Sequence, residues 1–402
     1  MRLISIRSMM TLGACLLAAC SSPNHSTQAQ QLSPSSQQAP LPSALPQTAL
    51  SEQPVATGPQ KNGPLFVPFR QEFVQENGAL SPYLKDWALQ LAEQRRIPFP
   101  TIEALLKQVR YEPQVLQLMA PAQGKRAQRN WPAYRARFTD TVRIDKGLAF
   151  WRLHQDSIEA IAQHYQVPAS ILVAIIGVET IYGHYMGDFS VLNALTNLGF
   201  SYPDPNRPDR AEMFRNQLAD LIELHYHNKL DAQTVRGSFA GAMGLPQFMP
   251  TSIKHWAVDA SNKGHVDLFA SVPDALASIA NFLNHHGWQA GLPVFIDISI
   301  PTTPPVAALV DGGLQPTLTW ATLQETLSLP SPSPLLEQQK FGLIDLPDPI
   351  NQNIEYRLAT ANFFALTAYN RSYFYASAVV DLACALEQGY YHRSSCSLWA
   401  NL

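Results

Sequence analysis

Hydrophobic residues recur at helical spacing along most of the chain between Phe66 and Leu292. Apolar positions three and four residues apart, with polar residues between them, are typical of helices that bury one face. The helices predicted here are Leu80–Arg95, Thr101–Val109, Leu148–Tyr165, Val191–Phe200, Ala211–His227 and Asp274–Trp288. Thr101 is expected to cap the second of these helices, and Gly287 lies just past the end of the last.

The pattern changes after Pro293, where apolar and polar residues alternate with a period of two. Such alternation predicts short strands joined by turns. The predicted strands are 294–300, 317–323, 341–346 and 354–359, and helical spacing returns at 359–370 and 377–388. The chain is therefore expected to be α+β and mainly α, with a small β subdomain inserted late and a functional groove between the two parts.

One stretch, Ile171–Gly183, is apolar at nearly every position up to Val178 and then carries a single carboxylate, Glu179. Pro168 suits the first turn of this helix and Gly183 suits the position after its end. Apolar surroundings and the negative end of a helix both raise the pKa of a carboxyl group, as a general acid requires. The alternative is a buried glutamate that pairs with an arginine for structure.

Composition narrows the class of partner. The chain has 402 residues, of which 46% are hydrophobic and 15% charged, and its net charge is −3. A protein that neutralises phosphates would be basic, so nucleic acid is not expected as a partner. An uncharged polymer such as a glycan is compatible with this composition.

The N-terminus has the features of an export signal, with Arg2 and Arg7 before the short apolar run Met9–Leu17. The following Leu-Ala-Ala-Cys20 resembles a bacterial lipobox, which implies cleavage after residue 19 and a lipid on Cys20. An ordinary secretory signal is the alternative. By analogy with sorted lipoproteins, Ser21 suggests the outer membrane. The residues up to 64 are rich in Ser, Pro, Gln and Ala and are expected to form a disordered tether.

The expected organisation is a signal peptide (1–19), a tether (20–64) and a catalytic region (65–402), itself divided at about 292 and 357. Cys384 and Cys396 lie twelve residues apart near the C-terminus. In an exported protein this spacing favours a disulfide, and two unpaired buried thiols are the alternative.

Two further stretches have unusual residues, Gly237–Pro250 (GSFAGAMGLPQFMP) and Tyr369–Tyr375 (YNRSYFY). Glycines allow a ligand to approach the backbone, and Ser238 and Gln247 offer neutral hydrogen-bonding groups suited to sugars. Aromatic rings in the second stretch could stack on sugar rings. A tight helix crossing and an aromatic core would give similar patterns without any ligand.

Together these segments resemble the membrane-bound lytic murein transglycosylase B family. The matching motifs are GVET around Glu179, GSFAGAMG with QFMP at Gly237–Pro250, YN–x–S at Tyr369–Ser372, and HGW at His286–Trp288. The resemblance implies a lysozyme-like helical core that cleaves the β-1,4 bond between N-acetylmuramic acid and N-acetylglucosamine and closes a 1,6-anhydro ring. Glu179 would act first as acid and then as base, and Asp188, in an expected surface turn, is interpreted as structural.

The resemblance also implies roles for individual residues. Those expected to contact the saccharide or its peptide are Ser238, Gln247, Tyr369, Asn370, Tyr375, Arg210, Tyr134 and Phe282, the last standing where a tyrosine is usual. The expected partners are peptidoglycan strands, the outer membrane through the lipid, and wall-synthesis proteins. A periplasmic, monomeric enzyme without cofactor is expected. A muramidase-type hydrolase and a glycan-binding scaffold without catalytic activity are the alternatives.

The stretch 259–270 has the spacing of an EF-hand-like loop, with Asp259, Ser261 and Asp267 at ligand positions. Lys263 stands where an oxygen ligand belongs, and Ala270 replaces the terminal bidentate carboxylate. The sequence therefore predicts no tight calcium site here.

Overall fold

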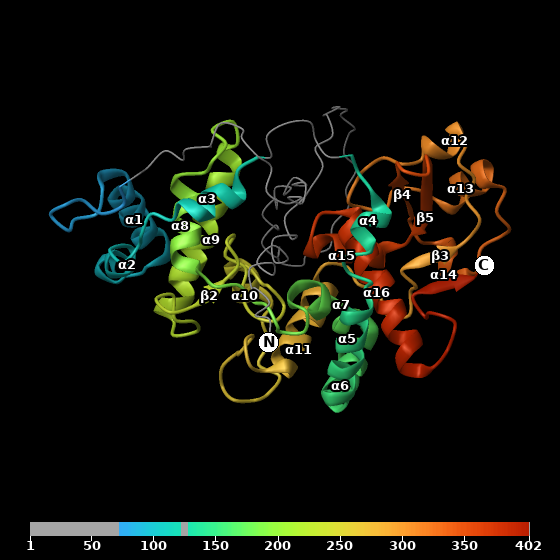
Figure 1. Cartoon of the computed structure of the whole chain (residues 1–402), viewed down its shortest axis with the longest axis horizontal. Coiled ribbons are helices and arrows are strands. Elements are labelled where there is room, and N and C mark those ends of the chain that lie inside the picture. The colour runs from blue at the N-terminus through green and yellow to red at the C-terminus, as the bar shows by residue number, and fades with distance from the viewer. Residues whose placement is uncertain (1–71, 122–127, 402) are drawn as a thin grey trace, which may run out of the picture.

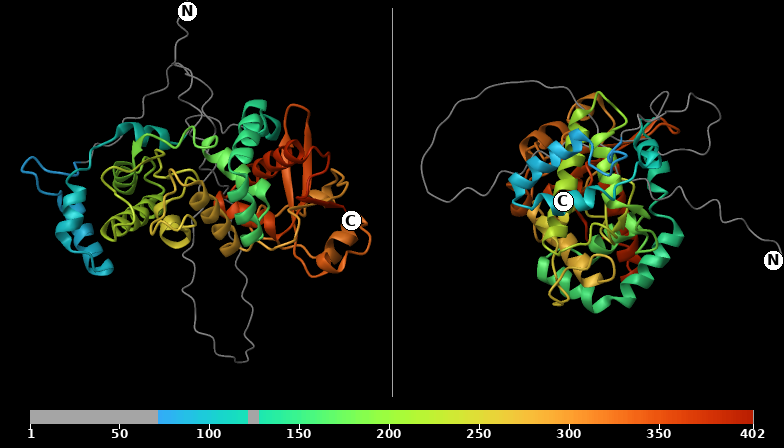
Figure 2. Two further views of the ribbon diagram at one scale, coloured as in Figure 1. Left: turned by 90° about the horizontal axis from the view of Figure 1, so that it is seen from below. Right: turned by 90° about the vertical axis from the view of Figure 1, so that its left-hand side faces the viewer.

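The computed structural model describes residues 72–121 and 128–401. The predicted signal peptide, Cys20 and the tether lie outside these residues. The described chain forms two groups of helices and two small sheets. In Figures 1 and 2 the N-terminal helices occupy one end of the molecule, and the four-stranded sheet lies at the opposite end with the C-terminus.

The first helical group encloses a core made mostly of aliphatic side chains. Its members are α1 (Pro82–Arg95), α2 (Phe99–Leu106), α3 (Pro113–Met119), α8 (Val191–Phe200) and α9 (Pro208–Tyr226). α8 begins where the Ser190 hydroxyl accepts a hydrogen bond from the amide of Asn193, which satisfies a free donor of the first turn. α9 buries Phe214, Leu218 and Leu221 on its inner face at helical spacing.

The second helical group contains the predicted central helix. It consists of α4 (Trp131–Arg135), α5 (Thr141–Leu153), α6 (Gln155–Tyr165), α7 (Ala169–Thr180), α11 (Val272–His285), α15 (Ala361–Tyr369) and α16 (Tyr373–Tyr391). Every residue of α7 from Ser170 to Thr180 is buried, as its uniformly apolar sequence predicts. α16 packs along α7, and the short α10 (Pro250–Trp256) contacts both α9 and α11.

The strands form two sheets. β1 (Phe189–Ser190) and β2 (Arg236–Gly237) make an antiparallel pair. The larger sheet has the order β4-β5-β3-β6, with β4 (Gly342–Asp348) and β5 (Asn353–Ala359) as a hairpin, β3 (Phe295–Asp297) antiparallel to β5, and β6 (Trp399–Asn401) parallel to β3. The predicted α+β class with a dominant helical part is confirmed.

Several predicted boundaries were wrong. The stretch 317–323 is not a strand, because the Thr319 hydroxyl caps α13 (Trp320–Leu327), which buries Trp320 and Leu323 one turn apart. The predicted β subdomain also contains the one-turn helices α12 (Pro304–Ala307) and α14 (Pro334–Glu337), and the strand expected at 294–300 shortens to β3.

The helical predictions also need correction. His154 has non-helical dihedral angles and divides the expected helix 148–165 into α5 and α6. α2 begins at Phe99 after Pro98, so Thr101 lies inside the helix and does not cap it. α7 ends at Thr180, and Ile181, not Gly183, takes the left-handed conformation that closes it.

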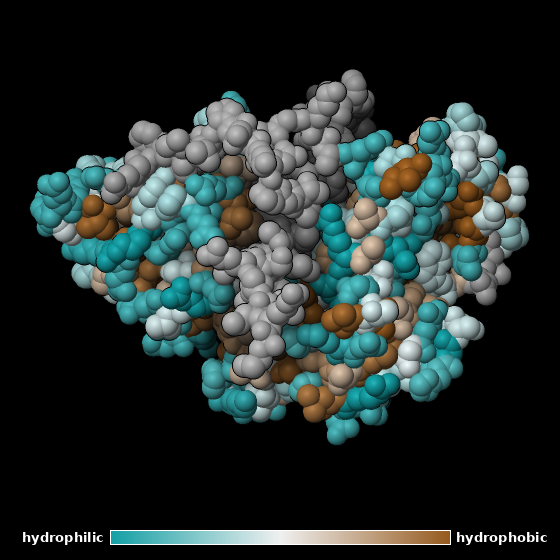
Figure 3. Space-filling view, in the orientation of Figure 1, coloured by the Kyte–Doolittle hydropathy of each residue, from teal (hydrophilic) through white to brown (hydrophobic). Residues whose placement is uncertain are grey.

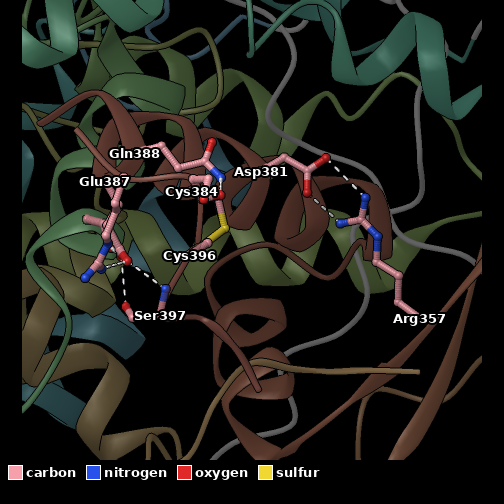
Figure 4. Close-up of a disulfide and its surroundings, with 10 residues drawn as sticks. Arg357, Asp381, Cys384, Glu387, Gln388, Cys396 and Ser397 are labelled. Atoms are coloured by element: carbon pink, nitrogen blue, oxygen red, sulfur yellow. Dashed lines mark hydrogen bonds and ion pairs between the residues drawn. A yellow bond between two sulfur atoms is a disulfide. The ribbon is translucent and has the colours of Figure 1, made fainter. Parts of the chain in front are cut away.

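The C-terminal part of α16 is held by a disulfide and a buried carboxylate. Cys384 and Cys396 are bonded, with Cα atoms 5.2 Å apart. One turn beyond Cys384, Glu387 accepts a hydrogen bond from the hydroxyl of Ser397 at 2.9 Å (Figure 4). It also accepts one from the hydroxyl of Ser170 at 3.0 Å. These contacts fix the loop that leads into β6.

The visible surface mixes polar and apolar residues, as Figure 3 shows for one face. Within the described ranges no single helix is long and apolar enough to cross a membrane. Only α6 and α7 taken together reach that length and apolar character, and the two helices meet at a bend of 115°.

Candidate active site

Glu179 lies in the last turn of α7 and is 7% exposed. Burial raises the pKa of its carboxyl group from 4.5 to about 8, and a hydrogen bond from Tyr375 works in the opposite direction. Glu179 forms no ion pair among the described residues, so the alternative of a structural pair with arginine is not what this fold contains. A carboxyl group in this state can hold a proton at neutral pH and release it during a reaction.

Two tyrosines from the C-terminal helices face this carboxyl group. Tyr375, 1% exposed near the start of α16, donates from Oη to Oε1 of Glu179 over 2.7 Å. Its place is set by Ser372, whose hydroxyl caps α16 by accepting from the amide of Tyr375. Tyr369 stacks on Tyr375 with ring centroids 6.3 Å apart and donates to the carbonyl of Pro246. Tyr375 therefore contacts the acid directly, and Tyr369 packs on Tyr375.

The glycine-rich segment Gly237–Pro250 packs against the end of α7. Thr180 donates from its hydroxyl to the carbonyl of Leu245 over 3.2 Å. Gln247, with a positive φ of 49°, donates from Nε2 to the carbonyls of Met186 and Gly244 at 3.1 and 3.0 Å. These bonds leave the Oε1 atom of Gln247 as an acceptor without a partner among the described residues.

Ser238 lies at the other end of this segment. Its Oγ accepts from the amide of Ala242 at 3.0 Å and keeps its own hydrogen for a ligand. Gly187 has φ +90°, and a Cβ there would overlap the carbonyl of Gly237. The glycine at 187 is therefore required for the close approach of the turn after α7 to the strand that precedes Ser238.

Comparison with known proteins identifies the family. A family model described as a transglycosylase SLT domain matches residues 80–384. The chain belongs to this transglycosylase family. It is 35% identical over 265 residues to the membrane-bound lytic murein transglycosylase B of Escherichia coli K12. The aligned residues cover 64% of this chain and 67% of that protein.

Two solved structures are also similar. The lytic transglycosylase Slt35 of Escherichia coli in complex with calcium has 32% identity and a TM-score of 0.65, covering 77% of this chain and 94% of that one. SltB3 from Pseudomonas aeruginosa in complex with NAG-NAM-pentapeptide has 28% identity and a TM-score of 0.63, covering 76% and 80%. The chain is therefore an enzyme of the transglycosylase family, with the fold these relatives share.

The remaining predicted residues of this transglycosylase pack beside the tyrosines and α16 in different ways. Phe282 is 4% exposed, and its ring is 5.0 Å from that of Tyr369, so it backs the aromatic pair. Asn370 follows Tyr369 and is 7% exposed. Tyr134 packs on Phe374, with ring centroids 5.3 Å apart, and so lies beside α16.

Arg210 lies apart from this cluster. It sits in the first turn of α9, is 3% exposed, and donates to Oη of Tyr202 over 3.4 Å. Its guanidinium also lies 5.8 Å from the ring of Phe214, within the first helical group, and burial lowers its pKa.

The transglycosylase contains one supporting residue that the sequence did not indicate. Arg143 of α5, 4% exposed, donates from Nε to the carbonyl of Gly177 over 3.0 Å. This bond satisfies a carbonyl in the last turn of α7, two residues before Glu179. A single arginine in an amphipathic helix gives no signal that distinguishes it from a surface charge.

The loop 259–270 closes on its own backbone. Asp259 accepts from the amides of Lys263 and Gly264 at 3.1 and 2.7 Å, and Asp267 accepts from those of Phe269 and Ala270 at 2.9 Å each. Within residues 72–121 and 128–401, no group of three His, Cys, Asp or Glu side chains is arranged to hold a metal ion. The absence of a tight calcium site stays a prediction.

Proposed function

We propose that this enzyme cleaves the β-1,4 bond between N-acetylmuramic acid and N-acetylglucosamine in peptidoglycan and leaves a 1,6-anhydromuramyl end. The observation that carries the proposal is Glu179, a carboxyl group whose pKa burial raises to about 8 and which accepts a hydrogen bond from Tyr375. The relatives support the substrate, since one is a murein transglycosylase and another was solved with NAG-NAM-pentapeptide.

The reaction would proceed in two proton transfers on one residue. Protonated Glu179 donates its proton to the glycosidic oxygen as the bond from that oxygen to C1 breaks. The resulting carboxylate, which still accepts the hydrogen bond from Tyr375, then takes the proton of the sugar's own C6 hydroxyl as that oxygen bonds to C1. Glu179 ends protonated, and no water is consumed.

A single acid is consistent with the surroundings of Glu179. A hydrolase of the usual kind needs a second carboxylate as nucleophile or water activator. Asp188 is exposed in the turn after α7, where its carbonyl accepts from Arg236 at 2.9 Å. Among the described residues, no carboxylate, Asp188 included, shares a hydrogen bond with Glu179. Ser238 and Gln247 would instead orient the saccharide through the free hydroxyl hydrogen and the free amide oxygen.

We further propose that the enzyme is a monomer in the periplasm, anchored to the outer membrane through a lipid on Cys20. The support is the lipobox-like sequence and the membrane-bound relative. The residues up to 64 would act as a tether, which lets the catalytic region reach the wall, where wall-synthesis proteins would be its partners.

The test is mass spectrometry of the products formed from purified peptidoglycan, with Glu179→Gln as the control. Products one water lighter than reducing muropeptides, absent with the variant, would support the anhydro mechanism. Reducing ends would mean hydrolysis and contradict the proposal. Glycan that is bound by the wild type but never cleaved would support a scaffold instead.

A further inference from the structure

A pocket of about 640 Å³ lies beside α4, separate from the groups that surround Glu179. Its walls come from α4, from the connection to α5, and from β5. The pocket is within the size range of small-ligand sites. Neither the mechanism above nor the predicted site uses any residue that lines it.

Two arginines line this pocket, and both bind Asp381 of α16. Arg357, buried in β5, donates to both carboxylate oxygens of Asp381 at 2.6 and 3.1 Å (Figure 4). Arg135 donates to Asp381 through Nε, and its side chain is 48% exposed. The Nη groups of Arg135 have no recorded partner among the described residues, so one edge of the guanidinium is available to a ligand.

Two carboxylates line the same pocket. Glu355 is 46% exposed and accepts from Nε of Arg357 at 2.6 Å. Asp140 is 42% exposed and caps α5 by accepting from the amide of Arg143 at 3.0 Å. Each therefore keeps lone pairs for another donor. Pro132 and Ala136 add apolar surface to the lining of the pocket.

We propose that this pocket binds a zwitterionic peptide segment, with a carboxylate on Arg135 and an ammonium group on Glu355 or Asp140. A ligand with one sign of charge would meet repulsion from the arginine or from the carboxylates, and an uncharged sugar would form no ion pair with either. The apolar surface suits the methylene chain between the two charged ends of a diamino acid.

The peptide stems of peptidoglycan carry carboxylates and an ammonium group joined by methylene chains. This identification of the ligand rests on the proposed function. α4 also links the pocket to the acid, because Tyr134, the neighbour of Arg135, packs on Phe374 beside Tyr375. A strand whose glycan lies at Glu179 could thus place a stem peptide, its own or that of an adjacent strand, against α4.

The probe is the synthetic tripeptide L-alanyl-γ-D-glutamyl-meso-diaminopimelate, titrated calorimetrically into the full-length protein in detergent. Arg135→Ala should weaken binding at least about tenfold, as expected for the loss of a hydrogen bond between charged groups. Arg152→Ala, which removes an exposed arginine of α5 outside the pocket, is the matched control and should bind normally. Acetylation of the side-chain amine removes the ammonium group of the tripeptide. The acetylated tripeptide should bind the wild type as weakly as the free tripeptide binds Arg135→Ala.

Arg135→Ala should still fold, because Arg357 keeps both hydrogen bonds to Asp381. Glu355→Gln is the second variant and should reduce discrimination between the free and acetylated tripeptides. No binding by the wild type, or equal binding by Arg135→Ala, would overturn the proposal.

Turnover separates this proposal from the catalytic one. Arg135→Ala should cleave glycan strands stripped of peptide at the wild-type rate but show a higher KM on peptide-bearing strands. A wild type that binds tripeptide without cleaving glycan would refute the proposed function alone. Cleavage without tripeptide binding would refute the peptide pocket alone.

Discussion

Replacing Glu179 with glutamine should make the fold more stable at alkaline pH. The pKa of Glu179 is about 8 in the fold and 4.5 without burial. In the unfolded chain the carboxyl group ionises above 4.5, while in the fold it stays protonated up to about 8. Ionisation therefore stabilises the unfolded state relative to the fold across this window, and stability present below pH 4.5 is lost as the pH rises through 8.

The difference of about 3.5 pKa units corresponds to a free energy of unfolding on the order of 5 kcal/mol. Glutamine has a similar shape, does not ionise, and can still accept the hydrogen bond from Tyr375. For a domain of this size, 5 kcal/mol raises the Tm by on the order of 10 °C. Glu179→Gln should therefore melt well above the wild type at pH 9 and close to it at pH 4.

The assay is thermal unfolding followed by circular dichroism between pH 4 and pH 9. Glu93→Gln, which removes an exposed carboxyl group from α1, is the control and should change Tm by little at any pH. Equal melting of the wild type and Glu179→Gln at pH 9 would refute the reasoning, because the carboxyl group would then ionise in the fold as easily as in water.

Three other changes test the geometry of the site. Tyr375→Phe removes the hydrogen bond that lowers the pKa of Glu179, so the alkaline limb of the plot of kcat against pH should move to higher pH. The control Tyr373→Phe should leave this limb in place, and identical limbs in both variants would contradict the reasoning. Gly187→Ala should lower kcat/KM at least about tenfold and reduce Tm, because φ +90° and the neighbouring carbonyl exclude a Cβ; unchanged kinetics would show that the turn can adapt. Reduction of the Cys384–Cys396 bond should cost about 3 kcal/mol of unfolding free energy, measured by urea denaturation, and an unchanged midpoint would mean that the loop is held by its other contacts.

The sequence predicted those elements whose signals are local and uniform. The bounds of α8, 191–200, agree with the prediction, because its apolar pattern is regular and Ser190 caps it. The all-apolar helix α7 was found for the same reason, and its buried carboxylate followed from its neighbours in the sequence. The hairpin strands β4 and β5 were located within two residues of their observed ends.

The sequence could not predict features decided by distant contacts. The helix break at His154 leaves both halves amphipathic, so periodicity alone reads through it. The hydrogen bond from Arg143 to the carbonyl of Gly177 depends on how α5 and α7 pack, which no spacing along the chain reveals. The two carboxylates that line the pocket beside α4, Asp140 and Glu355, come from segments more than 200 residues apart.

The unusual end of α7 has a consequence for what keeps Glu179 in place. Ile181 and Tyr182 both have positive φ, 51° and 59°, a conformation that costs non-glycine residues of order 1 kcal/mol each. What holds them there is packing, since the Tyr182 ring lies against Gly177 and against Gly147 of α5, where a Cβ would overlap it. An isolated α7 would not end in this way. The working position of Glu179 therefore depends on the packing of α7 against α5, and local loosening of these two helices should abolish activity before the protein as a whole unfolds.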